Sequence, residues 1–338
     1  MPYAVPMIRA LSLMPALRWL KSRDIDPEPF LHPLGLSSAP FGHPFRPVSL
    51  LRVGSLLRSI AREQGPDVPC RIVEEASSAE LGVLGSVALG TRTPVEAVAR
   101  ISTVLPMFCS HEQLSIRVAQ PFIGFWHSYT VRFDPETEHL MLQYALAMMD
   151  RLLGMTGAVG SRMARIDLPP HPDFGLSHLE SRFGDALRPA DGRGTHILVD
   201  PTIAERRFPK AARDRLLAGR LPALEPISGD GSFSGSVRII LASLLNDGVP
   251  TVRDLAGICG TSVRSFQRQL SHEGAAYSDL LQEMRQSHAL RLLSNPHATA
   301  KSVSADLGYE NQSSLTRAVL RWTGVSPKKL IPRGGKRG

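Results

Sequence analysis

Three long polar side chains near residue 265 have the spacing that places them on one face of a helix. Arg264, Gln267 and Arg268 fall at i, i+3 and i+4, and side chains at these positions project together. In the major groove of DNA, a guanidinium group can pair with guanine and a carboxamide with adenine. The apolar residues of this stretch form a separate stripe: Val263, Phe266 and Leu270. A solvated helix face could hold the same residues, so this stretch alone leaves both interpretations open.

A second stretch, which starts about fifty residues further along the chain, repeats the pattern. Its polar side chains are Gln312, Ser313, Ser314 and Arg317. Its inner apolar stripe consists of Leu315, Ala318, Val319 and Trp322. A solvated face is the better explanation of either helix alone. Two such helices in matching settings favour contact with base edges instead.

Short helices with clear start and stop signals position these two stretches. Thr251 and Asp254 have the spacing of a capping box, and Ser262 precedes the first stretch as a helix cap. A longer helical segment covers 277–295 and ends before Pro296, and a further short helix is expected in 298–309. This order predicts an all-α domain of two helix-turn-helix units joined by a long connector helix.

Most of the net charge lies in the same part of the chain. The 338 residues carry a formal net charge of +8, of which 14 Lys and Arg against 7 Asp and Glu in 233–338 supply +7. A polyanion-binding module joined to a nearly neutral domain has this distribution. A basic, solubilising C-terminal tail is the alternative, because the excess falls to +2 without the five basic residues after Pro327.

The first two thirds of the chain predict an α+β domain. Residues 10–64 have mainly helical patterns, and Thr93 followed by Pro94 marks the start of another helix. Two strands are expected within 112–133, on either side of Pro121, then a helix in 139–157 and a strand in 195–201.

Two features of this domain could belong to a ligand pocket. Phe125, Trp126, His127 and Tyr129 lie close together on a predicted strand and could line an apolar pocket with a few polar groups. A sheet core facing solvent on its other side is the more common explanation. The helical segment 143–155 could be a pocket wall, a dimerisation helix or part of the core.

A segment rich in Pro, Gly and Ser, residues 222–236, separates the two parts of the chain and predicts a flexible linker. We therefore expect an N-terminal domain at 1–221, the linker at 222–236, the helical domain at 237–332 and a basic tail at 333–338.

Signals for an enzyme or a metal site are weak. "GSFSG" at 231–235 has Phe233 where a nucleophile elbow has its nucleophile, and "GMTGAVG" at 154–160 lacks the Lys-Ser/Thr of a phosphate loop. The histidines of the N-terminal domain have neither metal-ligand spacing nor cysteine pairs beside them: His111, His127, His139, His171, His178 and His196. We expect no catalytic residues, no metal and no cofactor.

Cysteine usage and hydropathy indicate the compartment. Cys70, Cys109 and Cys259 are far apart and odd in number, which is typical of a reducing cytoplasm without a disulfide framework. No charge-free apolar run reaches the length of a membrane span. The sequence therefore predicts a cytoplasmic protein that does not contact a membrane.

Two segments resemble the DNA-binding halves of AraC/XylS family transcription regulators: "GTSVRSFQRQLSHEGAAYSDLLQEMRQSHALRLLSN" and "VSADLGYENQSSLTRAVLRWTGVSPKKL". The resemblance covers roughly 234–332. It implies base contacts from Arg264, Gln267, Arg268, Gln312, Ser313, Ser314 and Arg317. Leu315 and Val319 stand where many members have Phe, which suggests looser packing of the second unit. "AELGVLGSVALGTRTPVEAVARISTVL" is similar to the arabinose-regulator type of effector domain found in one large branch of the family. This similarity does not identify a ligand.

The resemblance implies a sequence-specific regulator that binds double-stranded DNA in two successive major grooves. It also implies a small-molecule effector, a homodimer and transcription activation through contact with RNA polymerase. Two alternatives stay open: a repressor or architectural DNA-binding dimer without an effector, and an enzyme with an accessory DNA-binding tail.

Overall fold

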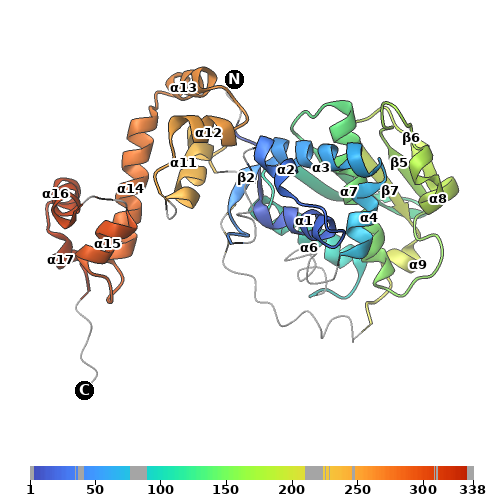
Figure 1. Ribbon diagram of the computed structural model, residues 1–338. Coiled ribbons are helices and arrows are strands. Elements are labelled where there is room, and N and C mark those ends of the chain that lie inside the picture. Colours follow the sequence, from blue (N-terminus) through green and yellow to red (C-terminus); the bar gives the residue numbers. More distant parts are fainter. Residues whose placement is uncertain are drawn as a thin grey trace. The chain divides into compact units, whose positions relative to one another are not determined.

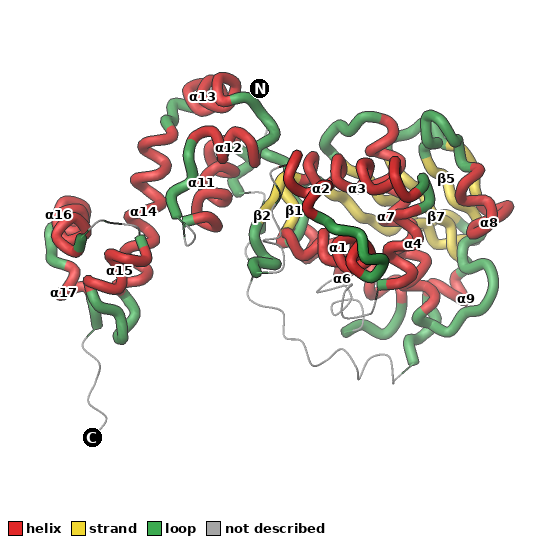
Figure 2. The backbone as a smooth tube through the Cα atoms, viewed as in Figure 1, coloured by secondary structure: helices red, strands yellow, loops and turns green. Residues whose placement is uncertain are grey.

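A computed structural model describes residues 4–34, 36, 42–76, 90–209, 224, 226–227, 229–245, 248–307, 309 and 311–332. The chain divides into two compact units, one of Pro6–Ser228 and one of Gly229–Gly338 together with Met1–Val5. In the described residues, strands occur only in the first unit (Figures 1 and 2). The predicted order of an α+β domain and an all-α domain is confirmed. The predicted basic tail 333–338 and most of the segment 80–90 lie outside the described residues.

The N-terminal unit is built on a mixed sheet with the strand order β3-β4-β7-β5-β6. Its strands are β3 (Glu112–Ala119), β4 (Phe122–Tyr129), β5 (Arg165–Leu168), β6 (Leu187–Pro189) and β7 (Gly194–Val199). The pair β5–β6 is parallel and the other pairs are antiparallel. The strands predicted on either side of Pro121 form the hairpin β3–β4. A separate two-stranded sheet pairs β1 (Met7–Arg9) with β2 (Pro47–Ser49), and the sequence did not predict it.

Helices of the N-terminal unit pack against the sheet and against one another. They are α1 (Met14–Lys21), α2 (Glu28–Leu31), α3 (Leu50–Gln64), α4 (Val68–Glu75), α6 (Pro94–Val104), α7 (Pro135–Gly154), α8 (Glu180–Phe183) and α9 (Pro201–Ala204). Short 3₁₀ turns are η1 (Ala10–Leu13), η2 (His32–Leu34), η4 (Leu105–Met107), η5 (Ser177–Leu179) and η6 (Gly184–Ala186). The Thr93 side chain accepts a hydrogen bond from the Glu96 N–H at the start of α6, as its sequence signal predicts.

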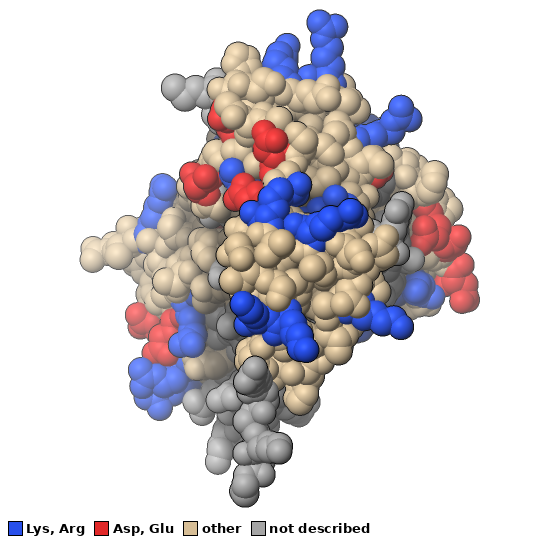
Figure 3. All heavy atoms as spheres, turned by 90° about the vertical axis from the view of Figure 1, so that its left-hand side faces the viewer, with Lys and Arg blue, Asp and Glu red and all other residues tan. Residues whose placement is uncertain are grey.

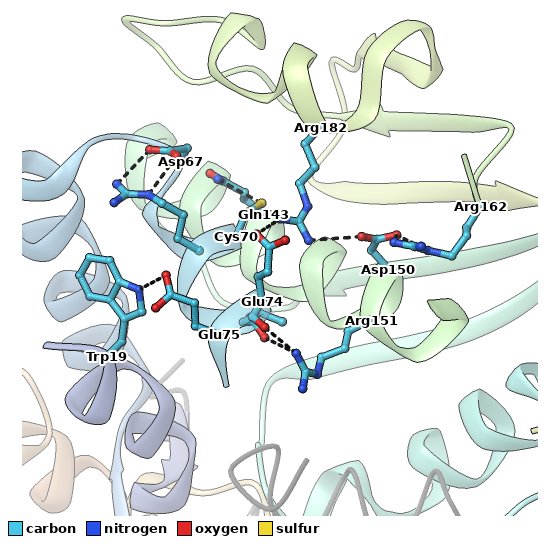
Figure 4. A network of polar contacts seen from close by, with 12 residues as sticks. Trp19, Asp67, Cys70, Glu74, Glu75, Gln143, Asp150, Arg151, Arg162 and Arg182 are labelled. Atoms are coloured by element: carbon cyan, nitrogen blue, oxygen red, sulfur yellow. Dashed lines mark hydrogen bonds and ion pairs between the residues drawn. The ribbon is translucent and has the colours of Figure 1, made fainter. Parts of the chain in front are cut away.

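The long helix α7 contacts α3, α4 and several strands, and ion pairs fix its position (Figure 4). Asp150 on α7 lies 2.7 Å from Arg162 and 3.3 Å from Arg182. Arg182 on α8 also lies 2.8 Å from Glu74 on α4, and Arg151 donates to main-chain carbonyls at the end of α4. Asp150 is buried, so solvent screens these pairs less than it would at the surface.

The C-terminal unit is helical throughout its described residues. Its helices are α11 (Phe233–Leu244), α12 (Val252–Ile258), α13 (Val263–His272), α14 (Tyr277–Leu293), α15 (Ala300–Asp306), α16 (Gln312–Thr323) and α17 (Pro327–Leu330). Among the described residues of the whole chain, none of the helices combines the length and hydropathy that crossing a bilayer needs.

The last residues of the predicted linker belong to α11. Ser232 caps this helix by accepting a hydrogen bond from the Gly235 N–H, and Ser234 and Ser236 are buried. A Cβ atom at Gly235 would lie 2.1 Å from Oδ1 of Asp230, so a larger residue would displace the carboxylate that bonds Ser232. The small residues that suggested flexibility therefore allow close packing at a helix start.

Candidate nucleic-acid interface and internal cavity

Capping side chains set the start of all four helices in the two helix-turn-helix units. Thr251 accepts a hydrogen bond from the Asp254 N–H at α12, and Ser262 accepts one from Ser265 at α13. In the second unit, Thr299 and Asn311 do the same for α15 and α16. These bonds satisfy N–H groups that have no partner within the helix. They therefore fix which residues occupy the first turns of α13 and α16.

In the first unit, α13 turns its apolar stripe inward and its polar residues outward. Phe266 and Leu270 are buried, and the Phe266 ring packs edge-on against Phe233 of α11, with 5.5 Å between ring centroids. The three predicted site residues Arg264, Gln267 and Arg268 are all exposed. The structure thus brings them together on the outer face of α13.

Glu273, just after α13, ties this helix to α11. Its carboxylate accepts hydrogen bonds from the N–H groups of Phe233 at 2.9 Å and Ser234 at 2.7 Å. Burial raises the pKa of Glu273, but the bonds from the Ser234 and Phe233 N–H groups outweigh burial and hold its pKa below the ordinary value. The negative charge also lies at the positive end of the α11 dipole.

In the second unit, α16 has the same orientation. Gln312, Ser313 and Arg317 are exposed, and Ser314 is half-buried. Ser314 donates to the Asn311 side chain at 3.1 Å and accepts from the Arg317 guanidinium at 3.4 Å. The structure places all four predicted residues on or beside the outer face. Ser314 forms hydrogen bonds with the side chains of Asn311 and Arg317.

The core behind α16 is aliphatic where many members of the AraC/XylS family have Phe. Leu315 and Val319 have no exposed surface, and they pack with Ala289, Leu293 and Val303. Trp322, which the sequence placed in the inner stripe, is only partly buried at the edge of this cluster.

The connector helix α14 contacts both helix-turn-helix units. Near its start, the Tyr277 hydroxyl donates to the Pro250 carbonyl ahead of α12, and Glu283 pairs with Arg238 of α11 at 3.1 Å. Near its end, Ala289 and Leu293 join the core of the second unit. Seventeen helical residues span about 25 Å. One rigid rod therefore links the supports of α13 and α16.

A groove of about 560 Å³ lies between α14 and α16. Three arginines line it, Arg285, Arg317 and Arg321, together with the aromatic side chains of Tyr277, Tyr309 and Trp322. Figure 3, which looks onto the helical unit, shows basic side chains gathered near the middle of this face. The sequence did not identify Arg285 as a site residue, because only the packing of two helices brings it near Arg317.

The N-terminal unit contains a partly open cavity of about 190 Å³ between the sheet and the helices α3, α6 and α7. Phe125, His127 and Tyr129 of β4 line it, as the sequence suggested, but Trp126 does not. Because side chains alternate along a strand, Trp126 points to the opposite face, where its ring lies 6.0 Å from that of His196. The predicted helix within 143–155 is part of α7 and forms one wall of the cavity.

Three histidines that are distant in the sequence pack together in the same unit. His139 donates or accepts through Nε2 at 3.0 Å from Nε2 of His178, and the His171 ring lies 5.4 Å from that of His139. Burial lowers the pKa of both His139 and His178 to about 4. In the described part of the chain, no cluster of His, Cys, Asp and Glu has the arrangement of a metal site.

Two helix-turn-helix units on one connector, each with an exposed polar second helix, define a DNA-binding helix-turn-helix protein. Comparison with known proteins agrees: residues 255–333 match a family model described as a helix-turn-helix domain. Residues 25–207 match the N-terminal arabinose-binding domain of AraC transcription regulators. The chain belongs to the AraC family of transcription regulators, and the proteins it matches are regulators rather than enzymes.

Individual relatives are similar over different parts of the chain. The HTH-type transcriptional regulator VirS of Mycobacterium tuberculosis is 24% identical over 351 residues, 98% of each chain. An uncharacterized HTH-type transcriptional regulator of the same organism is 35% identical over 102 residues, 30% of each chain. The crystal structure of the transcriptional regulator CdpR from Pseudomonas aeruginosa aligns with a TM-score of 0.42 and 17% identity, covering 94% of this chain and 97% of that one.

Proposed function

We propose that this transcription regulator reads a specific DNA site through α13 and α16 and responds to a small molecule held in its N-terminal unit. DNA reading is supported by the similar outer faces of the two helices. Arg264, Gln267 and Arg268 lie on the face of α13, and Gln312, Ser313 and Arg317 lie on the face of α16. These residues are exposed; Arg can pair bidentately with guanine and Gln with adenine, whereas Ser can bond either base.

The connector supports a two-groove mode of binding. The supports of α13 and α16 lie toward opposite ends of α14, and successive major grooves on one face of a duplex are about 34 Å apart. In this mode the groove with Arg285 and Arg321 faces the phosphates between the two major grooves. Exposed Arg291, Lys301, Lys328 and Lys329 would add phosphate contacts, which set affinity without reading sequence.

The cavity supports the proposal of an effector, because apolar clefts and cavities with a few polar groups are common ligand sites. A ligand that binds one conformation of the N-terminal unit more tightly would shift the population of DNA-binding states. We extend the proposal to a cytoplasmic homodimer that activates transcription by contacting RNA polymerase. In it, the unit Pro6–Ser228 senses the effector, the unit that contains α11 to α17 binds DNA, and 333–338 form a basic tail.

Selection of duplexes from a random pool by the full-length protein tests this function. We expect enrichment of a sequence with two conserved segments about one helical turn apart. Transcription from a template carrying that sequence then distinguishes activation from repression. Retention of random duplexes without enrichment would favour an architectural DNA-binding protein and contradict the proposal.

A further inference from the structure

The cavity of the N-terminal unit has an almost entirely apolar wall. Its lining comes from α1, α3, α6, α7 and the inner face of the sheet, and includes Leu57, Ile60, Met148 and Leu152. No Lys or Arg is present among the described residues that line it. An apolar cavity of about 150 Å³ can hold benzene, so this one suits a slightly larger molecule.

Polar groups meet at one corner of the cavity, where β3, β4 and α7 adjoin. Nε2 of His127 lies 2.7 Å from Oε1 of Glu112, and the His127 and Tyr129 rings are 5.1 Å apart. Burial raises the pKa of both Tyr129 and Tyr144, and the charge of nearby Glu112 adds to this effect. Both tyrosines line the cavity.

One atom in this corner is buried without a partner. The His127 side chain is 7% exposed, and its Nδ1 has no hydrogen-bond partner, although buried polar atoms nearly always have one. An ionised Glu112 can only accept, so Nε2 of His127 carries the hydrogen of their bond. Nδ1 has almost no accessible surface, so the acceptor that the corner offers to a bound molecule is the carboxylate of Glu112, which lines the cavity.

The same arrangement disfavours other ligand classes. A carboxylate or phosphate would lie beside Glu112 with no described Lys or Arg on the wall to neutralise it. A pentose has hydroxyl groups all around its ring, and most would face Leu, Ile, Val and Met. Buried hydroxyls without partners are costly. The matching family domain is named for arabinose, yet this wall does not suit a sugar.

We propose that the effector is a small, largely apolar alcohol or phenol, somewhat larger than benzene, whose single hydroxyl group donates to the Glu112 carboxylate. This inference rests on the proposed effector-sensing function. It names the chemical class that the N-terminal unit senses, and it excludes sugars and organic acids.

Isothermal titration of the full-length protein with four compounds tests the proposal. 4-Ethylphenol should bind at least about tenfold more tightly than ethylbenzene, which has the same body without the donor, because a hydrogen bond to a buried charged acceptor contributes strongly to affinity. 4-Ethylbenzoate should bind more weakly than both, and L-arabinose should not bind. Tighter binding of arabinose or of the benzoate, or equal binding of phenol and ethylbenzene, would overturn the proposal.

Two variants locate the site. Glu112→Gln should reduce the preference for 4-ethylphenol over ethylbenzene to less than about threefold, since a neutral acceptor bonds more weakly. Gln113→Ala, at an exposed neighbour on β3, is the control and should preserve the preference. Unchanged selectivity in Glu112→Gln would place the binding elsewhere and overturn the assignment.

The proposal and the proposed function can fail separately. If the protein enriches a specific duplex but binds none of the four compounds, the ligand class is wrong and the sequence-specific regulator stands. If the protein enriches no duplex but prefers 4-ethylphenol as expected, the cavity assignment stands and DNA reading fails.

Discussion

In the first helix-turn-helix unit an aromatic pair, Phe233 and Phe266, packs behind α13, whereas aliphatic Leu315 and Val319 fill the core behind α16. The outer faces differ as well. The face of α13 has two guanidinium groups and a carboxamide, whereas Arg317 is the single guanidinium of the predicted set on α16, and Ser314 partly holds it. We infer that the first unit provides more of the base-reading charge.

Truncation of the buried residues should produce the largest effects. Phe266→Ala should destabilise the first unit by about 3–5 kcal/mol, and Leu315→Ala the second by about 2–5 kcal/mol, because each leaves a cavity in a closed core. Hydrogen exchange of the amides in α13 and α16 measures the two units separately. Leu320→Ala, at a residue that is 51% exposed, is the control and should have little effect. A loss below about 1 kcal/mol for Phe266→Ala would contradict the aromatic core.

Removal of the outer arginines should have the next largest effect. Arg264→Ala and Arg317→Ala should each weaken the free energy of binding to the selected site by about 1–3 kcal/mol. Each should also relax the sequence preference at one base pair. The matched control is Arg238→Ala, which removes the same charge from a residue paired with Glu283. Quantitative binding to specific and random duplexes measures both effects. Equal losses on the two duplexes would refute base reading by that arginine.

The Glu273 link belongs to the first unit and gives a smaller, pH-dependent effect. Glu273→Gln should destabilise that unit by about 1 kcal/mol at pH 7, since it weakens two charge-assisted bonds. Because folding lowers the pKa of Glu273, its contribution is present above the ordinary glutamate value of about 4.3 and is lost as the pH falls through the folded value. The difference in stability between wild type and variant, measured by hydrogen exchange of the α13 amides, should therefore disappear at acidic pH. A constant difference would show that the charge is not the cause.

Lys328→Ala should produce the smallest effect. Loss of one phosphate contact lowers the slope of log affinity against log salt by about 0.9 on every duplex, without a change of sequence preference. Titrations at several salt concentrations measure this slope. An unchanged slope would mean that Lys328, which is exposed near the end of the second unit, is only solvated.

The sequence predicted the helical unit well because its signals are local. Thr251, Ser262 and the polar positions of α13 act within one or two helical turns, so spacing alone gives their structure. Two predictions from local signals were wrong. The small residues before Val237 indicated a linker where α11 begins, and grouping Trp126 with Phe125 and His127 as possible pocket residues ignored the alternation of side chains along a strand.

The cavity corner could not be predicted in this way. Glu112 and His127 meet because β3 pairs with β4 in a particular register, and Tyr144 joins them from α7. The basic groove has the same origin, since Arg285 and Arg321 come from separate helices. Such sites depend on tertiary packing between distant segments, which periodicity does not record.

Chemical footprinting of the full-length protein on its selected duplex tests the reading of DNA by α13 and α16 most directly. We predict two protected major-groove segments, centred about one helical turn apart on the same face of the duplex. Arg264→Ala should weaken protection in one segment and Arg317→Ala in the other. Protection of a single segment would contradict reading by both helices. Equal weakening of both segments by either substitution would also contradict it.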